Sequence, residues 1–157
     1  MRLAAFIYQD QPQVGWVRDD LAHVEVLDLS LAQREAGALS VIECLAAGEP
    51  IRSTNQVLAL SEVKLRAPIP RPRRNIFCVG KNYYAHAKEF AQSGFDSSAK
   101  AGGDIPSVPI IFSKVPECVV GPTDAIVIPK GVSQAIDYEA ELAVVIGEAE
   151  VADLPAR

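Results

Sequence analysis

The chain has 157 residues, of which 49% are hydrophobic and 22% charged, and its net charge is −5. This length and composition allow one domain or two small ones with a packed core, and they exclude a disordered chain. No apolar run reaches the roughly 18 residues of a membrane-spanning helix, and the N-terminus has no signal-peptide pattern, so we expect a cytoplasmic protein.

The negative charge is concentrated in the second half of the chain. Residues 1–74 hold nine Lys/Arg and nine Asp/Glu, whereas residues 75–157 hold six and eleven. A nucleic-acid surface needs clustered Lys and Arg, so nucleic acid is excluded as a partner. The acidic half fits either a cation site or a solvated acidic surface.

The first part of the chain predicts a small α+β unit. Residues 2–8 are mostly apolar, and residues 14–20 and 22–30 alternate in polarity, so three strands are expected. Apolar residues then recur at helical spacing, with Ser40 and Glu43 in a capping-box pattern at the start. Gly48 is expected to end this helix.

Alternate prolines in residues 60–75, LSEVKLRAPIPRPRRN, exclude a helix and indicate a junction. We therefore predict an N-terminal domain over residues 1–67 and a second domain over residues 68–157. In the second domain the pattern predicts strands at 76–83, 110–114 and 135–147, a helix at 82–94 and a lid-like loop at 95–109. The expected fold class is α+β, mostly β.

Three carboxylates alternate along the predicted strand at 135–147. Asp137, Glu139 and Glu141 would share one face, because side chains at i and i+2 point to the same side of a strand. A solvent-exposed face is one interpretation. The other is a divalent-cation site for Mg²⁺ or Mn²⁺, with Ca²⁺ as an alternative, because these ions prefer oxygen ligands.

The helix at 82–94 carries a candidate general base. His86 and Glu89 are three residues apart and share a helix face, where the carboxylate would fix the imidazole tautomer for proton transfer. An ordinary surface pair is the alternative. His23 has no partner in the sequence pattern and is interpreted as structural. Lys114 ends a strand, where it either reaches a cleft or is solvated.

Two stretches together resemble the fumarylacetoacetate hydrolase family, in particular its bacterial 2-hydroxyhepta-2,4-diene-1,7-dioate isomerase and 5-carboxymethyl-2-hydroxymuconate isomerase-like members. They are APIPRPRRNIFCVGKNYYAHAKE and PIIFSKVPECVVGPTDAIVIPKGVSQAIDYEAELAVVIG. The resemblance implies a small N-terminal domain followed by a mixed, mostly β roll, a homodimer and bound Mg²⁺ or Mn²⁺.

The resemblance also implies roles for individual residues. Glu139 and Glu141 match metal carboxylates, and His86 and Glu89 match a pair that activates water. Lys114 matches a strand lysine near the site. On the substrate and lid side, we assign Asn82, Tyr83 and Lys100.

The implied activity is hydrolysis of a C–C bond in a small β-diketo or 2-oxo acid, of fumarylacetoacetate or acylpyruvate type, in aromatic-compound catabolism. Isomerisation or decarboxylation of the same class of substrate is an alternative. The family's third metal ligand, an aspartate in a stretch resembling NDVSARD, has no match, so we expect the chain to represent the N-terminal half of such a protein. A non-catalytic protein that binds metal weakly, or an interaction fragment, is the competing interpretation.

Overall fold

The computed structural model describes residues 1–92, 108–132, 136 and 138–147. It divides into two compact units, residues 1–125 and 126–157. The predicted domain boundary between residues 67 and 68 stays a prediction. Among the described helices, none has the length and apolar character needed to cross a bilayer.

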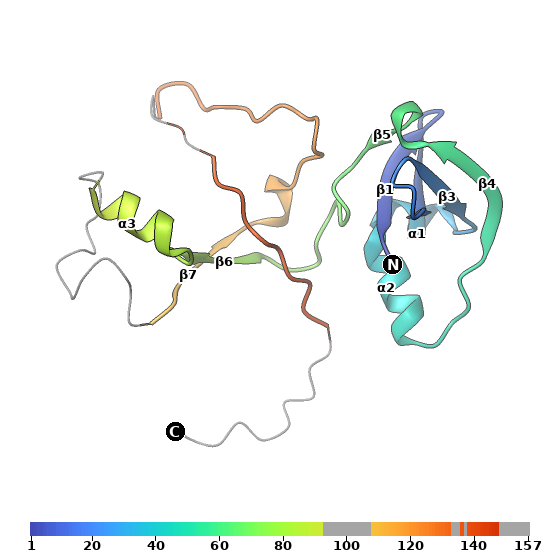
Figure 1. The fold of residues 1–157 in the computed structure, drawn as a ribbon, viewed down its shortest axis with the longest axis horizontal. Coiled ribbons are helices and arrows are strands. Elements are labelled where there is room, and N and C mark those ends of the chain that lie inside the picture. Colours follow the sequence, from blue (N-terminus) through green and yellow to red (C-terminus); the bar gives the residue numbers. More distant parts are fainter. Residues whose placement is uncertain (93–107, 133–135, 137, 148–157) are drawn as a thin grey trace, which may run out of the picture. The chain divides into compact units, whose positions relative to one another are not determined.

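The N-terminal part is built on a five-stranded antiparallel sheet (Figure 1). Its strands are β1 (Leu3–Tyr8), β2 (Gln11–Val17), β3 (His23–Leu27), β4 (Ser53–Ala59) and β5 (Lys64–Leu65). They lie in the order β4-β3-β2-β1-β5. The three strands predicted from the first thirty residues are confirmed as β1, β2 and β3.

The sheet must curl, because its two edge strands are joined by a very short connection. A flat sheet of five strands would separate β4 from β5 by about 19 Å, at about 4.8 Å per strand spacing. The link from Ala59 to Lys64 includes the 3₁₀ turn η1 (Leu60–Glu62), which advances only about 2 Å per residue. The link is too short for a flat sheet, so the edges approach each other.

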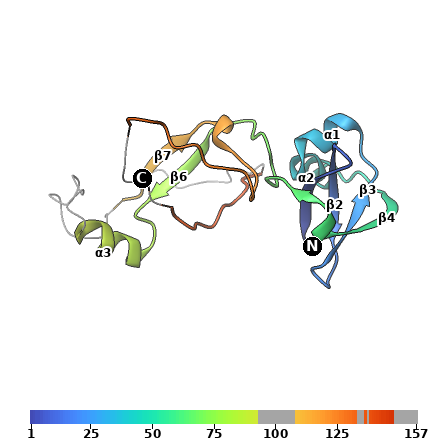
Figure 2. The same cartoon turned by 90° about the horizontal axis from the view of Figure 1, so that it is seen from above.

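Both faces of this sheet are packed. On one face a cluster contains Phe6, Val24 and Leu58, and the η1 region covers it with Leu60 and Val63. On the other face, a second cluster joins residues of β2 and β3 to α2 (Ala38–Ala46); its fully or nearly fully buried members are Val14, Leu27 and Val41. Figure 2 shows α2 and the preceding helix α1 (Leu31–Ala36) beside the sheet.

The helix pair corrects one sequence prediction. The capping box lies at Ser30 and Gln33, where it starts α1, and not at Ser40 and Glu43. The Ser40 hydroxyl is buried and donates toward the carbonyl oxygens of Gln33 and Gly37, both at 2.9 Å. Sequence alone did not distinguish the two serines, because both precede a helix-spaced apolar run.

Gly48 does end α2, as predicted. Its φ is +69°, in the left-handed region that favours glycine, and its N–H donates to the carbonyl of Leu45 at 3.1 Å. The next amide, that of Glu49, donates to the carbonyl of Cys44 at 2.8 Å. The two hydrogen bonds satisfy carbonyls that the end of the helix would otherwise leave unpaired.

The second sheet has two antiparallel strands, β6 (Ile76–Gly80) and β7 (Ile110–Lys114). The helix α3 (Tyr84–Gln92) follows β6 (Figure 1). The strand predicted at 110–114 is therefore confirmed with the same bounds, and the strand predicted at 76–83 and the helix predicted at 82–94 are confirmed with shorter bounds. A 3₁₀ turn, η3 (Pro116–Cys118), comes after β7.

The strand expected at 135–147 is not formed in the described part of this segment. Residues 136 and 138–147 contain no strand, and the apolar side chains of Leu142, Val144 and Ile146 are exposed. Neither is a strand assigned between residues 125 and 129. The physical reason is that a strand needs a hydrogen-bonded neighbour, and a local sequence pattern does not supply one.

A turn at residues 121–124 is fastened to β5 by one carboxylate. Asp124 accepts a hydrogen bond from the Gly121 amide at 2.9 Å through Oδ2, and its Oδ1 lies 3.1 Å from Lys64 Nζ. The amide hydrogen bond, followed by the lysine, lowers the pKa of the Asp124 carboxyl below its ordinary 3.8. A Cβ on Gly121 would lie 2.9 Å from Asp124 Oδ2, so a side chain here would displace the carboxylate that closes the turn.

We expect Asp124→Asn to lower the free energy of unfolding at neutral pH. A carboxyl whose pKa is depressed by folding stabilises the folded state above its unfolded-state pKa and loses that effect as the pH falls through its folded-state pKa. The difference between variant and wild type should therefore shrink below pH 3.8. Denaturant unfolding across this range measures it, with Asp19→Asn as an exposed control; a difference that does not change with pH would contradict the assignment.

Candidate active site

The predicted base lies on α3, directly after the end of β6. The first hydrogen bond of this helix runs from the amide of Ala87 to the carbonyl of Tyr83, at 2.9 Å. Ala87 is 1% exposed and faces the interior, whereas His86 is half-buried and Glu89 is exposed. His86 and Glu89 therefore lie on one helix at the spacing that lets two side chains meet, with the imidazole nearer the interior.

The predicted substrate-side residues are divided between two segments. Asn82 and Tyr83 stand between β6 and α3, and both are exposed, Tyr83 to 44%. They precede His86 by less than one and a half helical turns. Lys100 lies outside the described residues.

The pairing of β6 with β7 separates Lys114 from the helix. In the register, Gly80 pairs with Ile110 and Ile76 pairs with Lys114. The α3 helix follows the Gly80 end, so Lys114 sits at the opposite end of this two-stranded ribbon, about 14 Å away along the strand at about 3.4 Å per residue. Its ammonium lies 5.9 Å from the centre of the Phe112 ring, a cation–π contact within its own strand. The structure thus does not bring Lys114 to the His86 end of the ribbon, and its catalytic role stays a prediction.

The two predicted metal carboxylates belong to the second compact unit. Glu139 and Glu141 are both exposed, and Asp137 lies outside the described residues. Within the described segments, no group of three His, Cys, Asp or Glu side chains is arranged to hold a metal ion. The donors fit Mg²⁺ or Mn²⁺ in kind, since both are carboxylates, but they are two in number and form only part of a ligand set.

A second histidine–carboxylate pair was missed by the sequence analysis. His23 Nδ1 lies 2.8 Å from Asp20 Oδ2 in the turn before β3, and Asp20 Oδ1 accepts hydrogen bonds from the amides of Ala22 and His23. These bonds, first that from Ala22, lower the pKa of Asp20. The expectation that His23 had no partner is wrong. Asp-x-x-His across a polar turn was the available signal, and the pair is an exposed turn-forming contact.

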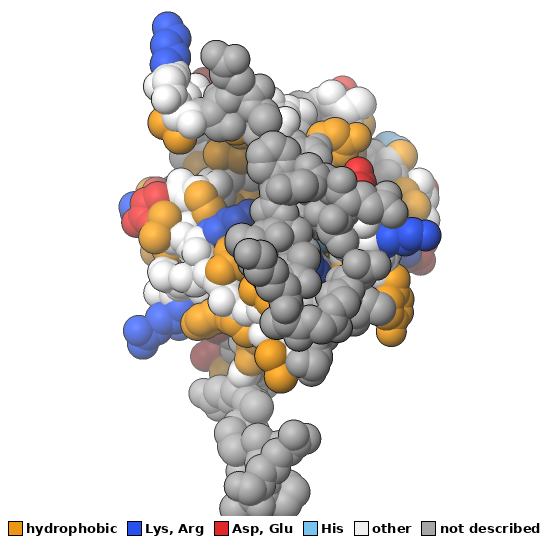
Figure 3. Space-filling model, turned by 90° about the vertical axis from the view of Figure 1, so that its left-hand side faces the viewer, with side chains coloured by type: hydrophobic (Ala, Val, Ile, Leu, Met, Phe, Trp, Pro, Cys, Tyr) orange, Lys and Arg blue, Asp and Glu red, His pale blue; other side chains and the backbone are white. Residues whose placement is uncertain are grey.

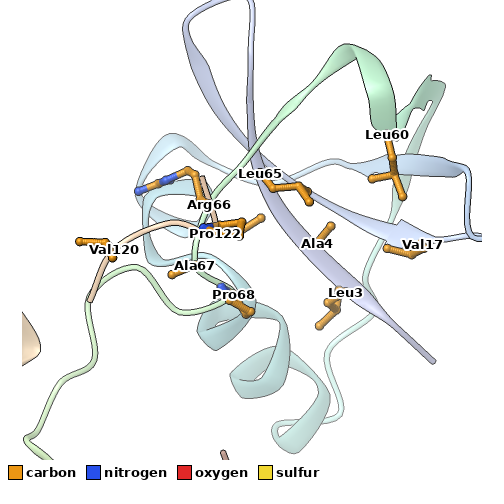
Figure 4. A pocket seen from close by; sticks show the side chains of 11 residues that line it. Leu3, Ala4, Val17, Leu60, Leu65, Arg66, Ala67, Pro68, Val120 and Pro122 are labelled. Carbon is orange, nitrogen blue, oxygen red and sulfur yellow. The ribbon is translucent and has the colours of Figure 1, made fainter. Parts of the chain in front are cut away.

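An apolar pocket of about 470 Å³ lies against the N-terminal sheet (Figure 4). It is bounded by β1, the residues after β5, and Val120 and Pro122 of the later segment. Arg66 is the charged residue in its lining, and none of the predicted site residues contributes to it. A site for a small polar acid needs several convergent polar groups, so this pocket does not fit the expected substrate class.

Apolar side chains also remain at the surface of the second sheet. Phe77 on β6 is 74% exposed and Ile111 on β7 is 57% exposed. Figure 3 shows hydrophobic side chains at the surface among charged ones on the face that it presents. A two-stranded ribbon with such exposure is marginally stable by itself, so further packing partners are expected for it.

Comparison with known proteins gives a consistent set of matches. Residues 75–156 match the family model described as fumarylacetoacetate (FAA) hydrolase C-terminal. The oxaloacetate tautomerase YisK of Bacillus subtilis is 37% identical over 156 residues, with 86% of this chain and 48% of YisK covered. The human mitochondrial oxaloacetate tautomerase FAHD2A is 42% identical over 118 residues, with 75% of this chain and 32% of FAHD2A covered.

A solved structure gives a similar result for the fold. An uncharacterized protein from Mycobacterium abscessus matches with a TM-score of 0.51 at 23% identity, over 85% of this chain and 40% of that protein. The chain spans about half the length, or less, of the relatives that it matches.

Proposed function

The chain belongs to the fumarylacetoacetate hydrolase family, and we propose that it takes part in the keto–enol tautomerisation of oxaloacetate or a closely related 2-oxo dicarboxylic acid. The observation that carries this proposal is the similarity to two oxaloacetate tautomerases, one bacterial and one mitochondrial. The matched range 75–156 includes His86, Glu89, Glu139 and Glu141. An isomerase-type activity is therefore favoured over the C–C hydrolysis expected from the family resemblance.

Tautomerisation requires one proton to leave the carbon beside the carbonyl and one proton to reach the carbonyl oxygen. In this proposal His86 accepts the carbon-bound proton, the enolate oxygen takes a proton from water, and His86 then releases its proton to water, so no other reactant is consumed. Glu89, three residues along the same helix, holds the imidazole in the tautomer that accepts at the substrate side. Burial of Ala87 fixes the rotation of the helix, and thereby the side on which His86 stands.

Members of this family generally bind a divalent metal, and Glu139 and Glu141 are the residues that would hold it here. When bound, such an ion supplies electrostatic stabilisation of the negative charge on an enolate oxygen. The remaining ligands would be water, substrate oxygens or other carboxylates. We also propose that the protein forms a homodimer, and sedimentation velocity would measure this oligomeric state.

We expect the chain to bind Mn²⁺ through these glutamates. Glu139→Gln and Glu141→Gln should each weaken binding by about tenfold or more, since each removes an anionic oxygen ligand. Calorimetric titration measures it, with Glu117→Gln as a control at an exposed acid elsewhere in the chain. If both variants bind Mn²⁺ as the wild type does, the ion is held elsewhere and the two glutamates are not its ligands.

The deciding experiment follows the ultraviolet absorbance of enol oxaloacetate as it converts to the keto form, with purified protein and Mn²⁺ or Mg²⁺. Acceleration above the uncatalysed rate would support the tautomerase proposal. Hydrolysis of an acylpyruvate without tautomerase activity would instead favour the hydrolase, which the family's own name suggests. Neither activity in a folded, monodisperse chain would favour the non-catalytic alternative.

A further inference from the structure

The connection between β6 and α3 contains a strained backbone position. Lys81 has φ +53°, in the left-handed region that glycine adopts readily and other residues adopt at a cost of about 1–2 kcal/mol. It follows Gly80, the last residue of β6, and two residues separate it from the start of α3. Its side chain is half-buried. Strained backbone positions are concentrated at functional sites, so Lys81 is a candidate for a functional role.

Among the described lysines, Lys81 is the one that stands directly before the helix that carries the proposed base. The described residues from 75 onward include four lysines and no arginine: Lys81, Lys88, Lys114 and Lys130. Lys114 stands at the far end of the ribbon, and Lys130 belongs to the second unit. Lys88 is two residues from His86 on α3, so it points to a different side of the helix, about 200° around the axis. Lys81 precedes the first turn of the helix that carries His86.

A 2-oxo dicarboxylic acid presents a second carboxylate beyond the reacting carbon. A cation on a short, fixed segment is the group that recognises such a carboxylate, through a charge-assisted hydrogen bond. We propose that Lys81 binds this distal carboxylate and makes the site selective for dicarboxylic over monocarboxylic 2-oxo acids. The inference rests on the proposed function, because it assumes that His86 acts on this class of substrate.

Two substitutions separate recognition from a structural role. Lys81→Met keeps the aliphatic chain and removes the charge. Lys81→Gly also removes the charge but relieves the backbone conformation, so it should not lower the melting temperature. Both variants should raise KM for oxaloacetate by about tenfold to a hundredfold with a smaller change in kcat, whereas Lys88→Met should leave both unchanged.

Selectivity provides the second readout. Tautomerisation of 2-oxobutanoate, which lacks the distal carboxylate, should be equally fast in wild type and in both Lys81 variants. Binding of succinate, which has two carboxylates but no keto group, should be at least about tenfold weaker in the variants when measured by calorimetry. The succinate measurement does not depend on turnover, so it distinguishes the two proposals.

The outcomes are separable. An active wild type whose KM is unchanged by Lys81→Met and Lys81→Gly overturns the role of Lys81 and leaves the tautomerase proposal standing. An inactive wild type that binds succinate through Lys81 overturns the tautomerase proposal and retains the carboxylate site. Equal succinate binding by wild type and both variants overturns the site whatever the activity.

Discussion

Replacement of His86 by glutamine is expected to lower the rate of oxaloacetate tautomerisation by about 10²–10⁴-fold, the contribution of a positioned general base. Glutamine keeps a polar side chain of similar length but cannot accept and return a proton at neutral pH. The fold should tolerate the change, because His86 is only half-buried and the buried contact of this turn belongs to Ala87. The measurement is the initial rate of enol disappearance, compared at equal protein and Mn²⁺ concentration.

The chain offers a matched control in its other histidine. His23 also stands three residues from a carboxylate, that of Asp20, but it lies in the turn before β3, outside the matched range 75–156. His23→Gln should leave the rate within about twofold of wild type, since an exposed pair contributes little. Equal losses in the two variants would assign them to folding, and a fully active His86→Gln would remove His86 as the base.

The helices and strands that depend mainly on residues close together in the chain could be predicted from the sequence. β1, β2 and β3, β6 and β7, and α3 all follow from polarity patterns that are local in the chain. The capping box was placed ten residues too late, because both Ser30 and Ser40 precede apolar residues at helical spacing. Gly48 was placed correctly because a glycine that ends a helix has a strong conformational reason to be there.

Features that depend on how strands pair could not be predicted from a local sequence pattern. The placement of Lys114 away from α3 follows from the register of β6 with β7, which no single segment specifies. The left-handed conformation of Lys81 likewise could not be predicted from the local sequence. The acid-bearing segment at 138–147 has the alternation of a strand, but no strand is assigned to it in the structure.

Replacement of Phe6 by alanine is expected to lower the free energy of unfolding by about 3–5 kcal/mol, the cost of truncating a fully buried phenylalanine. Phe6 is 0% exposed and lies on β1, which pairs with both β2 and β5. Its removal leaves a cavity against Val24 and Leu58, in a curled sheet that cannot easily collapse onto the space. Denaturant unfolding followed by Trp16 fluorescence measures the change, because this tryptophan lies in the same sheet.

Phe77→Ala is the matched control and tests the second sheet at the same time. Phe77 is 74% exposed on β6, so its truncation should change the free energy of unfolding by no more than about 0.5 kcal/mol. A loss as large as that of Phe6→Ala would contradict this expectation and mean that the face of β6 is covered in solution. Repeating the unfolding at several protein concentrations then identifies what packs on β6. If a second copy of the chain packs there, the loss in free energy of unfolding depends on protein concentration, whereas packing within one chain gives a loss that does not.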